Sequence, residues 1–217
     1  MIRESVENFL ENLPHHVQLV GAAKTRSFDE IEEAIKGGLR IVGENYLQEA
    51  EKAYQIFGTS VKWHMIGHLQ KNKVNRAVRI FDMIETVDSI ELAMAIERGC
   101  SNIEKSMEIL IEINSAEEPQ KAGVMPDMAL SLIEEIAPLK SIRIMGLMTM
   151  GPATGDTEKI RPYFKKTKKL FESIREKNIP KVEMRYLSMG MSDSYRVAIE
   201  EGANMVRIGT ILFGERS

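Results

Sequence analysis

The chain has 217 residues, of which 43% are hydrophobic and 28% charged, and its net charge is −3. This is ordinary for a globular protein, and the lack of a basic excess argues against nucleic acid and acidic membranes as partners. A single cysteine, Cys100, excludes an intramolecular disulfide and favours a reducing compartment. The sequence has no signal-peptide core and no run of about 18 apolar residues, so we expect no membrane span and a cytoplasmic protein.

Short apolar runs recur along the chain, and their spacing predicts eight strands. Each run is almost continuously apolar, which is typical of strands buried on both faces in a parallel sheet. The predicted strands are Val17–Lys24, Leu39–Asn45, Lys62–Gly67, Met83–Asp88, Met107–Asn114, Ile142–Thr149, Met184–Gly190 and Met205–Thr210.

Helical patterns separate these runs. They are predicted at Ser27–Gly37, Ile90–Arg98, Thr157–Lys177 and Ser192–Glu201. Alternating strands and helices indicate parallel strands with helical crossovers, and eight units predict a (β/α)8 TIM barrel that takes in residues 1–217 as one domain. The alternative is an open doubly wound sheet, but no G-x-G-x-x-G motif follows the first run.

The first segment of the chain also has a helical pattern, with Val6, Phe9, Leu10 and Leu13 on one face. Too few residues follow the eighth strand to form a full closing helix. We therefore expect this extra N-terminal helix to close the outer ring or to cover one end of the barrel.

Polar residues collect where the predicted strands end. In a (β/α)8 barrel these carboxyl ends form the mouth that carries the active site. The residues expected there are Lys24, Asn45, Gly67-His68, Asp88, Asn114, Thr149, the turn 188–192 and the segment 207–210.

The loops after strands seven and eight predict a phosphate site, because barrels commonly bind phosphate there. In "LSMGMSDSYRVAIEEG" a strand and a Ser-Gly-Ser turn precede a helix, and we predict Ser192 as its N-cap. In "MVRIGTILFG" the strand ends in Gly209-Thr210. Ordinary turn chemistry is the alternative explanation for each loop alone.

Lys24 and Arg207 are cations placed inside apolar strands. For Arg207 a structural ion pair with a barrel acid explains the pattern equally well. A lysine in an apolar site has a lowered pKa and can act as a nucleophile. A lysine that forms a Schiff base with a phosphorylated aldehyde would use all of these features, and pyridoxal 5′-phosphate (PLP) is such an aldehyde.

Seven stretches resemble, in order and spacing, the pyridoxal phosphate homeostasis proteins (the YggS/PROSC type), which are similar to the barrel domain of alanine racemase. The stretches are "AAKT" at 22–25, "GENYLQE" at 43–49, "WHMIGHLQKNK" at 63–73, "INSAEEPQKAG" at 113–123, "GLMTM" at 146–150, "LSMGMSDSY" at 187–195 and "VRIGTILFG" at 206–214. One departure is His68, which stands where many relatives have proline. It lies at a strand end and could alter access to the cofactor, although a surface imidazole explains it as well.

The resemblance implies a role for eight residues in binding PLP. Lys24 would hold the cofactor as an aldimine, and Arg207 would face the pyridine nitrogen and keep it unprotonated, which makes the ring a weaker electron sink. The implied phosphate ligands are Ser188, Ser192, Gly209 and Thr210, and the residues implied to lie near the cofactor are Asn45 and His64.

The resemblance implies an intracellular protein that stores, buffers or delivers PLP without robust catalysis, with PLP-dependent apoenzymes as possible recipients. The sequence ends seven residues after Thr210, so we expect no second domain to supply the other acid/base group of alanine racemase. One alternative is a racemase-like enzyme with Lys24 as its base and Tyr46, Tyr195 or His64 as partner. Another is an aldolase-like barrel in which Lys24 binds a sugar phosphate.

Metal binding is not predicted. Neither His15-His16 nor the pair His64 and His68 comes with a matching set of ligands. The sequence does not indicate an oligomeric state.

Overall fold

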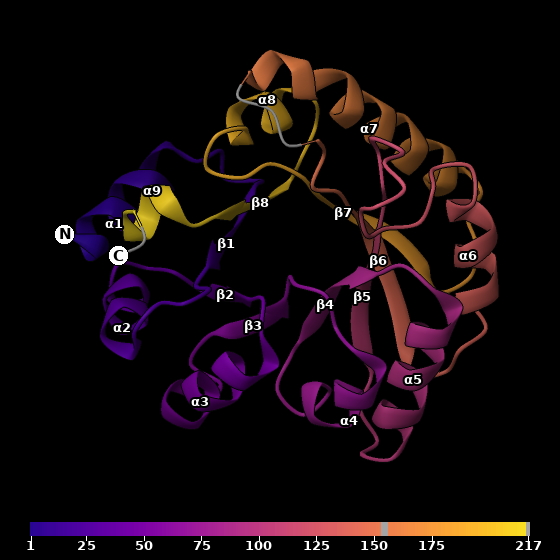
Figure 1. The fold of residues 1–217 in the computed structure, drawn as a ribbon, viewed down its shortest axis with the longest axis horizontal. Coiled ribbons are helices and arrows are strands. Elements are labelled where there is room, and N and C mark those ends of the chain that lie inside the picture. Colours follow the sequence, from indigo (N-terminus) through magenta and orange to yellow (C-terminus); the bar gives the residue numbers. More distant parts are fainter. Residues whose placement is uncertain (153–155, 216–217) are drawn as a thin grey trace.

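The computed structural model describes residues 1–152 and 156–215, and their eight strands close into a parallel barrel (Figure 1). Each strand pairs with the next along the chain, and β1 also pairs with β8, so the (β/α)8 prediction is confirmed. The strands are β1 Gln18–Ala22, β2 Ile41–Glu44, β3 Lys62–Met65, β4 Met83–Val87, β5 Met107–Glu112, β6 Ile142–Met148, β7 Val182–Ser188 and β8 Met205–Ile208.

The strands end earlier than the apolar runs predict. β1 ends two residues before Lys24, and β8 ends two residues before Thr210. The buried Ala23 continues the apolar run after β1 has ended, and Gly209 separates β8 from the short helix Thr210–Phe213. Lys24 and Asn45 therefore stand on loops beyond the strand ends, and Thr210 is the first residue of that helix.

Helices alternate with the strands and form the outer layer of the molecule (Figure 1). The α-helices of the described residues are α1 Ile2–Asn12, α2 Phe28–Lys36, α3 Leu47–Phe57, α4 Val74–Ala77, α5 Ile90–Ser101, α6 Ala129–Ile136, α7 Arg161–Glu176, α8 Tyr195–Glu200 and α9 Thr210–Phe213, with 3-10 turns η1 at Lys71–Lys73 and η2 at Thr157–Ile160.

The predicted helix boundaries are right where a cap defines them. α2 begins after Ser27, whose hydroxyl accepts a hydrogen bond from Glu30 N while the Glu30 carboxylate accepts one from Ser27 N, a complete capping box. The predicted stop at Gly99 is wrong, because α5 continues to Ser101. Gly99 is buried within α5, and a Cβ there would lie 3.3 Å from Oδ1 of Asn75 in α4, so the two helices pack against each other at this glycine.

The N-terminal helix closes the outer ring. α1 packs between α2 and the short α9, as Figure 1 shows at the indigo and yellow ends of the chain. Val6 and Phe9 of α1 are buried, and the Phe9 ring lies 5.1 Å from that of Tyr195. Of the two expected roles for this helix, closure of the ring is the observed one.

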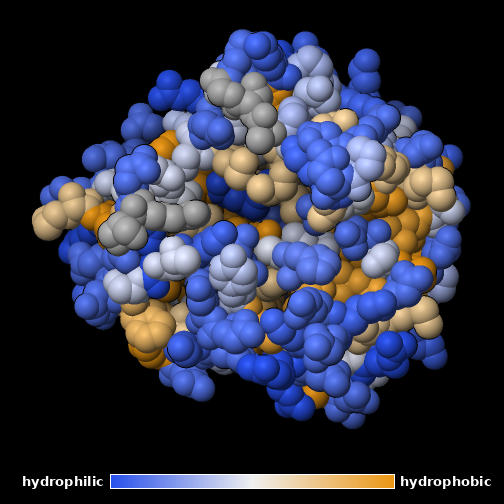
Figure 2. Space-filling view, in the orientation of Figure 1, coloured by the Kyte–Doolittle hydropathy of each residue, from blue (hydrophilic) through white to orange (hydrophobic). Residues whose placement is uncertain are grey.

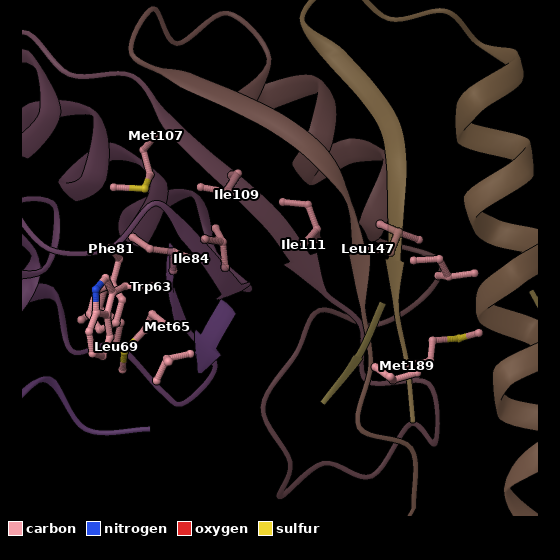
Figure 3. Packing of buried hydrophobic residues seen from close by; sticks show 14 of the residues in the cluster. Trp63, Met65, Leu69, Phe81, Ile84, Met107, Ile109, Ile111, Leu147 and Met189 are labelled. Atoms are coloured by element: carbon pink, nitrogen blue, oxygen red, sulfur yellow. The ribbon is translucent and has the colours of Figure 1, made fainter. Parts of the chain in front are cut away.

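Two apolar layers hold the barrel. The larger lies between strands and helices and includes Trp63, Phe81 and Ile109, which pack closely with their neighbours in Figure 3. The second, smaller layer fills the barrel interior. Its buried members are Val20, Ile41, Ile66, Met83, Leu110, Met145, Met148 and Met205. Because these apolar side chains fill the interior, the polar residues that follow the strands lie at the mouth of the barrel.

The strand register is irregular on both sides of β6, where Gly146 has a φ of +146°. A Cβ at this position would lie 1.8 Å from the carbonyl oxygen of Tyr186 on β7. Only glycine permits this close approach of two backbones. The shift in register helps to set which β6 and β7 side chains reach the mouth.

The face seen in Figure 2 is mostly hydrophilic, with scattered hydrophobic side chains. Among residues 1–152 and 156–215, no helix is both long and apolar enough to cross a bilayer.

Candidate functional site

A cavity of about 730 Å³ lies at the carboxyl ends of β1 and β8, and we call it the Lys24 cavity. Ala22, Ile66, Met150 and Met191 contribute apolar walls. The structure brings together six of the eight residues predicted for the site, namely Lys24, Asn45, Ser192, Arg207, Gly209 and Thr210.

The Lys24 amine is free of polar partners in the described part of the chain. No hydrogen bond or ion pair joins it to those residues, and its Nζ lies 5.2 Å from the centroid of the Tyr46 ring. An aromatic face stabilises a cation only weakly at an exposed site. The Tyr46 ring therefore lies beside the Lys24 amine, and no carboxylate of the described residues pairs with that amine.

A carboxylate does hold the backbone next to Lys24. Thr25 has a φ of +63°, a conformation that is uncommon for a residue with a side chain. Its N–H donates to Oε2 of Glu49, in the first turn of α3, over 3.0 Å. Glu49 thus stabilises the bend that turns Lys24 into the cavity.

Arg26, which follows Thr25 in the same bend, contacts residues near the end of the described chain. The Arg26 guanidinium donates to the carbonyl of Gly214 and, over 3.1 Å, to Oε1 of Glu30. It also lies 5.5 Å from the centroid of the Phe213 ring in α9. The loop that carries Lys24 is therefore linked to the loop that carries Gly209 and Thr210.

The Glu49→Ala variant is expected to capture PLP about tenfold less well, because a hydrogen bond to a charged group is worth about 1.5–3 kcal/mol. The Glu49→Gln variant keeps an acceptor oxygen and should restore most of the capture. A titration with PLP followed by absorbance measures both. Equal losses in the two variants would contradict a positioning role for this hydrogen bond.

A buried polar network lies beneath the Lys24 cavity, inside the barrel. Glu85 of β4 is its centre: its Oε1 lies 2.7 Å from Nδ1 of His64, and its Oε2 accepts from Ser188 over 2.7 Å. Arg207 Nη1 donates to the same Ser188 hydroxyl over 2.6 Å, and Nη2 donates to the Thr149 carbonyl over 2.9 Å. Three strands far apart in sequence thus fix the guanidinium at the cavity floor.

The network keeps Glu85 ionised. Burial alone would raise its pKa, but the hydrogen bond from His64 and the charges of His64 and Arg207 hold the pKa below the ordinary 4.5. Because a carboxylate only accepts hydrogen bonds, Nδ1 of His64 carries the proton that faces Glu85. The ion pair between Arg207 and a barrel acid, the alternative weighed from the sequence, is present at 4.0 Å between Nη1 and Oε2. Arg207 also lines the Lys24 cavity, so a structural ion pair and a place in the candidate site are both observed for this residue.

Two predicted ligands do not line the cavity. Ser188 is fully buried and His64 is 3% exposed, and both are occupied by Glu85. Inward-facing side chains on β3 and β7 reach the barrel interior below the mouth. Ser188 therefore contacts Arg207 directly, and His64 acts on it only through Glu85; neither residue lines the Lys24 cavity.

The prediction that Ser192 caps the following helix is wrong. α8 begins only at Tyr195, because residues 192–194 form a turn in which Ser194 Oγ accepts from Met191 N. Ser192 Oγ instead accepts hydrogen bonds from the backbone N–H groups of Gly209 and Ile211, at 3.3 and 3.4 Å. The two predicted phosphate loops therefore meet through this hydroxyl.

Glu44, at the end of β2, is a buried acid with one unsatisfied oxygen. It is 1% exposed, and its Oε2 has no hydrogen-bond partner among residues 1–152 and 156–215. Burial and the nearby charge of Glu49 raise its pKa to about 8. Glu44 is therefore largely a neutral acid at neutral pH, close behind the loop that Glu49 holds.

Because the pKa of Glu44 is higher in the folded than in the unfolded chain, its contribution to stability is present at low pH and is lost as the pH rises to about 8. The Glu44→Gln variant should lose less stability between about pH 5.5 and 8.5, by at most about 3 kcal/mol. Urea unfolding of the PLP-free chain at both pH values measures this. The same pH dependence in both proteins would contradict the assignment.

Sequence reasoning missed Glu85, Glu49 and Glu44 as parts of the site. Glu85 and Glu44 carried the same signal that marked Lys24, a charge inside an apolar run. His68 is exposed and lines a separate cavity with Asn45 and Tyr46, outside the Lys24 cavity. The described residues contain no cluster of three or more side chains suited to a metal ion.

Comparisons with known proteins agree with this geometry. The family described as "Alanine racemase, N-terminal domain" matches residues 2–217. A pyridoxal phosphate homeostasis protein of Aquifex aeolicus is 40% identical over 201 residues, covering 92% of this chain and 87% of the relative. The mouse protein of that name is 37% identical over 227 residues, covering 99% and 83%.

Solved structures agree as well. PipY of Synechococcus elongatus, in a structure with PLP bound, matches with a TM-score of 0.91 and 30% identity over 99% of this chain and all of that chain. An alanine racemase of Clostridium difficile shares the fold, with a TM-score of 0.81 and 19% identity over 99% of this chain and 56% of that chain. The chain belongs to the alanine racemase N-terminal domain family and, within it, to the pyridoxal phosphate homeostasis proteins.

Proposed function

We propose that this protein binds PLP and serves intracellular PLP homeostasis, with Lys24 holding the cofactor covalently. The observation that carries the proposal is a lysine amine without a polar partner among the described residues, in one cavity with a buried arginine and a Ser-Gly-Thr cradle. The names of the relatives and the PLP bound to PipY support it.

The residues of the Lys24 cavity fit the chemistry of PLP. The Lys24 amine suits the aldehyde, and the Arg207 guanidinium suits the pyridine nitrogen. Ser192 and Thr210 offer hydroxyl donors for a phosphate, and Gly209, whose N–H donates to Ser192 Oγ, joins the two in the wall of the cavity. PLP, when bound, supplies an electrophilic carbon and an electron sink.

We propose a carrier role rather than robust catalysis. An arginine opposite the pyridine nitrogen favours the unprotonated ring, which is the weaker electron sink. Of the residues considered as a second acid/base group, Tyr195 packs on Phe9 and accepts from Arg196, and His64 is buried against Glu85. Tyr46, beside Lys24, is the one that supports the alternative of a racemase-like enzyme.

One experiment separates these roles. The PLP-loaded protein is mixed with a PLP-dependent apoenzyme, whose recovered activity reports delivery, and is tested in parallel for turnover of L- and D-amino acids. We expect delivery of PLP to the apoenzyme without enzyme-like turnover of amino acids. This is the result for a cytoplasmic protein that passes PLP to recipient apoenzymes. Turnover at enzyme-like rates that depends on Tyr46 would establish the racemase-like alternative.

A further inference from the structure

A second cavity, of about 330 Å³, lies beside the Lys24 cavity at the ends of β5 and β6. Met150 and Met191 line both cavities, so the two methionines form a shared wall. The polar residues of the second cavity are Glu112, Asn114, Ser115 and Lys121. Its volume is large enough for a small molecule.

Glu112 is the one acid of this cavity wall and has no partner. Glu112 is 8% exposed, and no hydrogen bond or ion pair joins its carboxylate to any other residue within 1–152 and 156–215. A carboxylate that lines a cavity and has no protein partner among these residues is available to accept hydrogen bonds from a ligand.

The other polar side chains of the cavity are engaged. Ser115 Oγ lies 2.9 Å from the hydroxyl of Thr149, and Asn114 Nδ2 donates to the Glu118 carbonyl over 2.8 Å. Lys121 pairs with Glu118 at 2.7 Å, so it does not neutralise Glu112. The unmet hydrogen-bonding capacity of the cavity is therefore that of the Glu112 carboxyl group.

The charges around Glu112 favour an incoming cation. Burial and the charge of Asp88 raise its pKa to about 7, while Arg207 acts in the opposite direction. The Asp88 carboxylate accepts a long 3.4 Å hydrogen bond from Gly123 N. A cation beside Glu112 would thus offset two acids at once.

We propose that this second cavity binds a small molecule with a primary ammonium group, which donates its hydrogen bonds to the Glu112 carboxylate while its carbon chain packs on Met150 and Met191. An ammonium is favoured over a metal ion because the described residues offer no group of three metal-ligating side chains. This site is distinct from the proposed PLP site, and its ligand binding does not depend on PLP.

Saturation-transfer NMR on the PLP-free full-length chain tests the site, with n-propylammonium as the probe and 1-propanol as its neutral counterpart. We expect propylammonium to bind and propanol to bind at least about tenfold more weakly, since the lost hydrogen bond involves a charge. L-alanine, measured alongside, distinguishes amino acids from simple amines as the source of the ammonium group.

Variants locate the binding. Glu112→Gln keeps the shape of the side chain and should weaken propylammonium binding about tenfold or more. Glu108→Gln, at the opposite end of β5 and paired with Arg143, is the matched control and should bind like the wild type. Ala116→Phe should block the cavity while leaving Glu112 in place.

Lys24→Ala separates this site from the PLP site, because it should lose PLP capture and still bind propylammonium. The inference is overturned if the wild type does not bind propylammonium, if propanol binds equally well, or if Glu112→Gln binds as the wild type does. PLP capture by the Glu112→Gln chain serves as the check that this variant is folded.

Discussion

The Lys24→Ala variant is expected to lose covalent capture of PLP completely. The wild-type chain mixed with PLP and reduced with borohydride should gain the mass of one PLP less one water and plus two hydrogens, because the Schiff base forms with loss of water and is then reduced. The variant should keep the mass of the unmodified chain. The reason is that Lys24 lines the cavity proposed for PLP and that its amine has no competing polar partner among the described residues. An amine already paired with a carboxylate would be a poorer nucleophile.

Lys121→Ala is the matched control for this result. Lys121 also lies at the barrel mouth, but it lines the second cavity and is paired with Glu118. Its variant should form the same reduced PLP adduct as the wild type does. The Lys24→Ala chain should retain weaker, non-covalent PLP binding, because Arg207 and the Ser192 turn remain. An unchanged yield of reduced adduct in Lys24→Ala would refute the assignment.

The Glu85→Ala variant is expected to lose about 3–5 kcal/mol of folding free energy, the usual cost of breaking a buried ion pair by removing one partner. Glu85 is fully buried, and its loss would leave the Arg207 guanidinium without a counter-ion and Ser188 and His64 without their shared acceptor. Urea unfolding of the PLP-free chain, treated as two-state, measures this loss.

Glu183→Ala is a control of the same chemical kind at the opposite end of the barrel. Glu183 pairs with Arg143 at 2.7 Å, but both side chains are about half exposed to water. Exposed pairs contribute about 0–1 kcal/mol. If both variants lost the same amount of stability, the network under the cavity would not be the support that we assign to it.

The fold could be predicted from the sequence because one physical signal dominates it. Strands buried on both faces must be apolar throughout, and eight such runs alternating with helices leave few architectures. The strand ends could not be predicted to the residue, because the apolar run continues through the buried Ala23 after β1 ends, and because α9 begins only two residues after β8.

The site was only partly predictable. A charge in an apolar run identifies Lys24 and Arg207, and it also marks Glu44, Glu85 and Glu112, which the strand-end reasoning passed over. Which charges meet depends on strands that are distant in sequence, so the contact between Glu85 and Ser188 had no local signal.

Turn chemistry limited the prediction in the same way. Ser192 precedes a helix in sequence and has the residue type of an N-cap. Its hydroxyl nevertheless accepts from Gly209 and Ile211 in the next loop, a tertiary contact that competes with local capping.

The most direct test of the central claim is peptide mapping by mass spectrometry of the wild-type chain after PLP loading and borohydride reduction. We predict that the reduced adduct sits on Lys24, in the peptide that carries "GAAKTR". An adduct found mainly on any other lysine would contradict the account, even if the intact protein bound one PLP per chain.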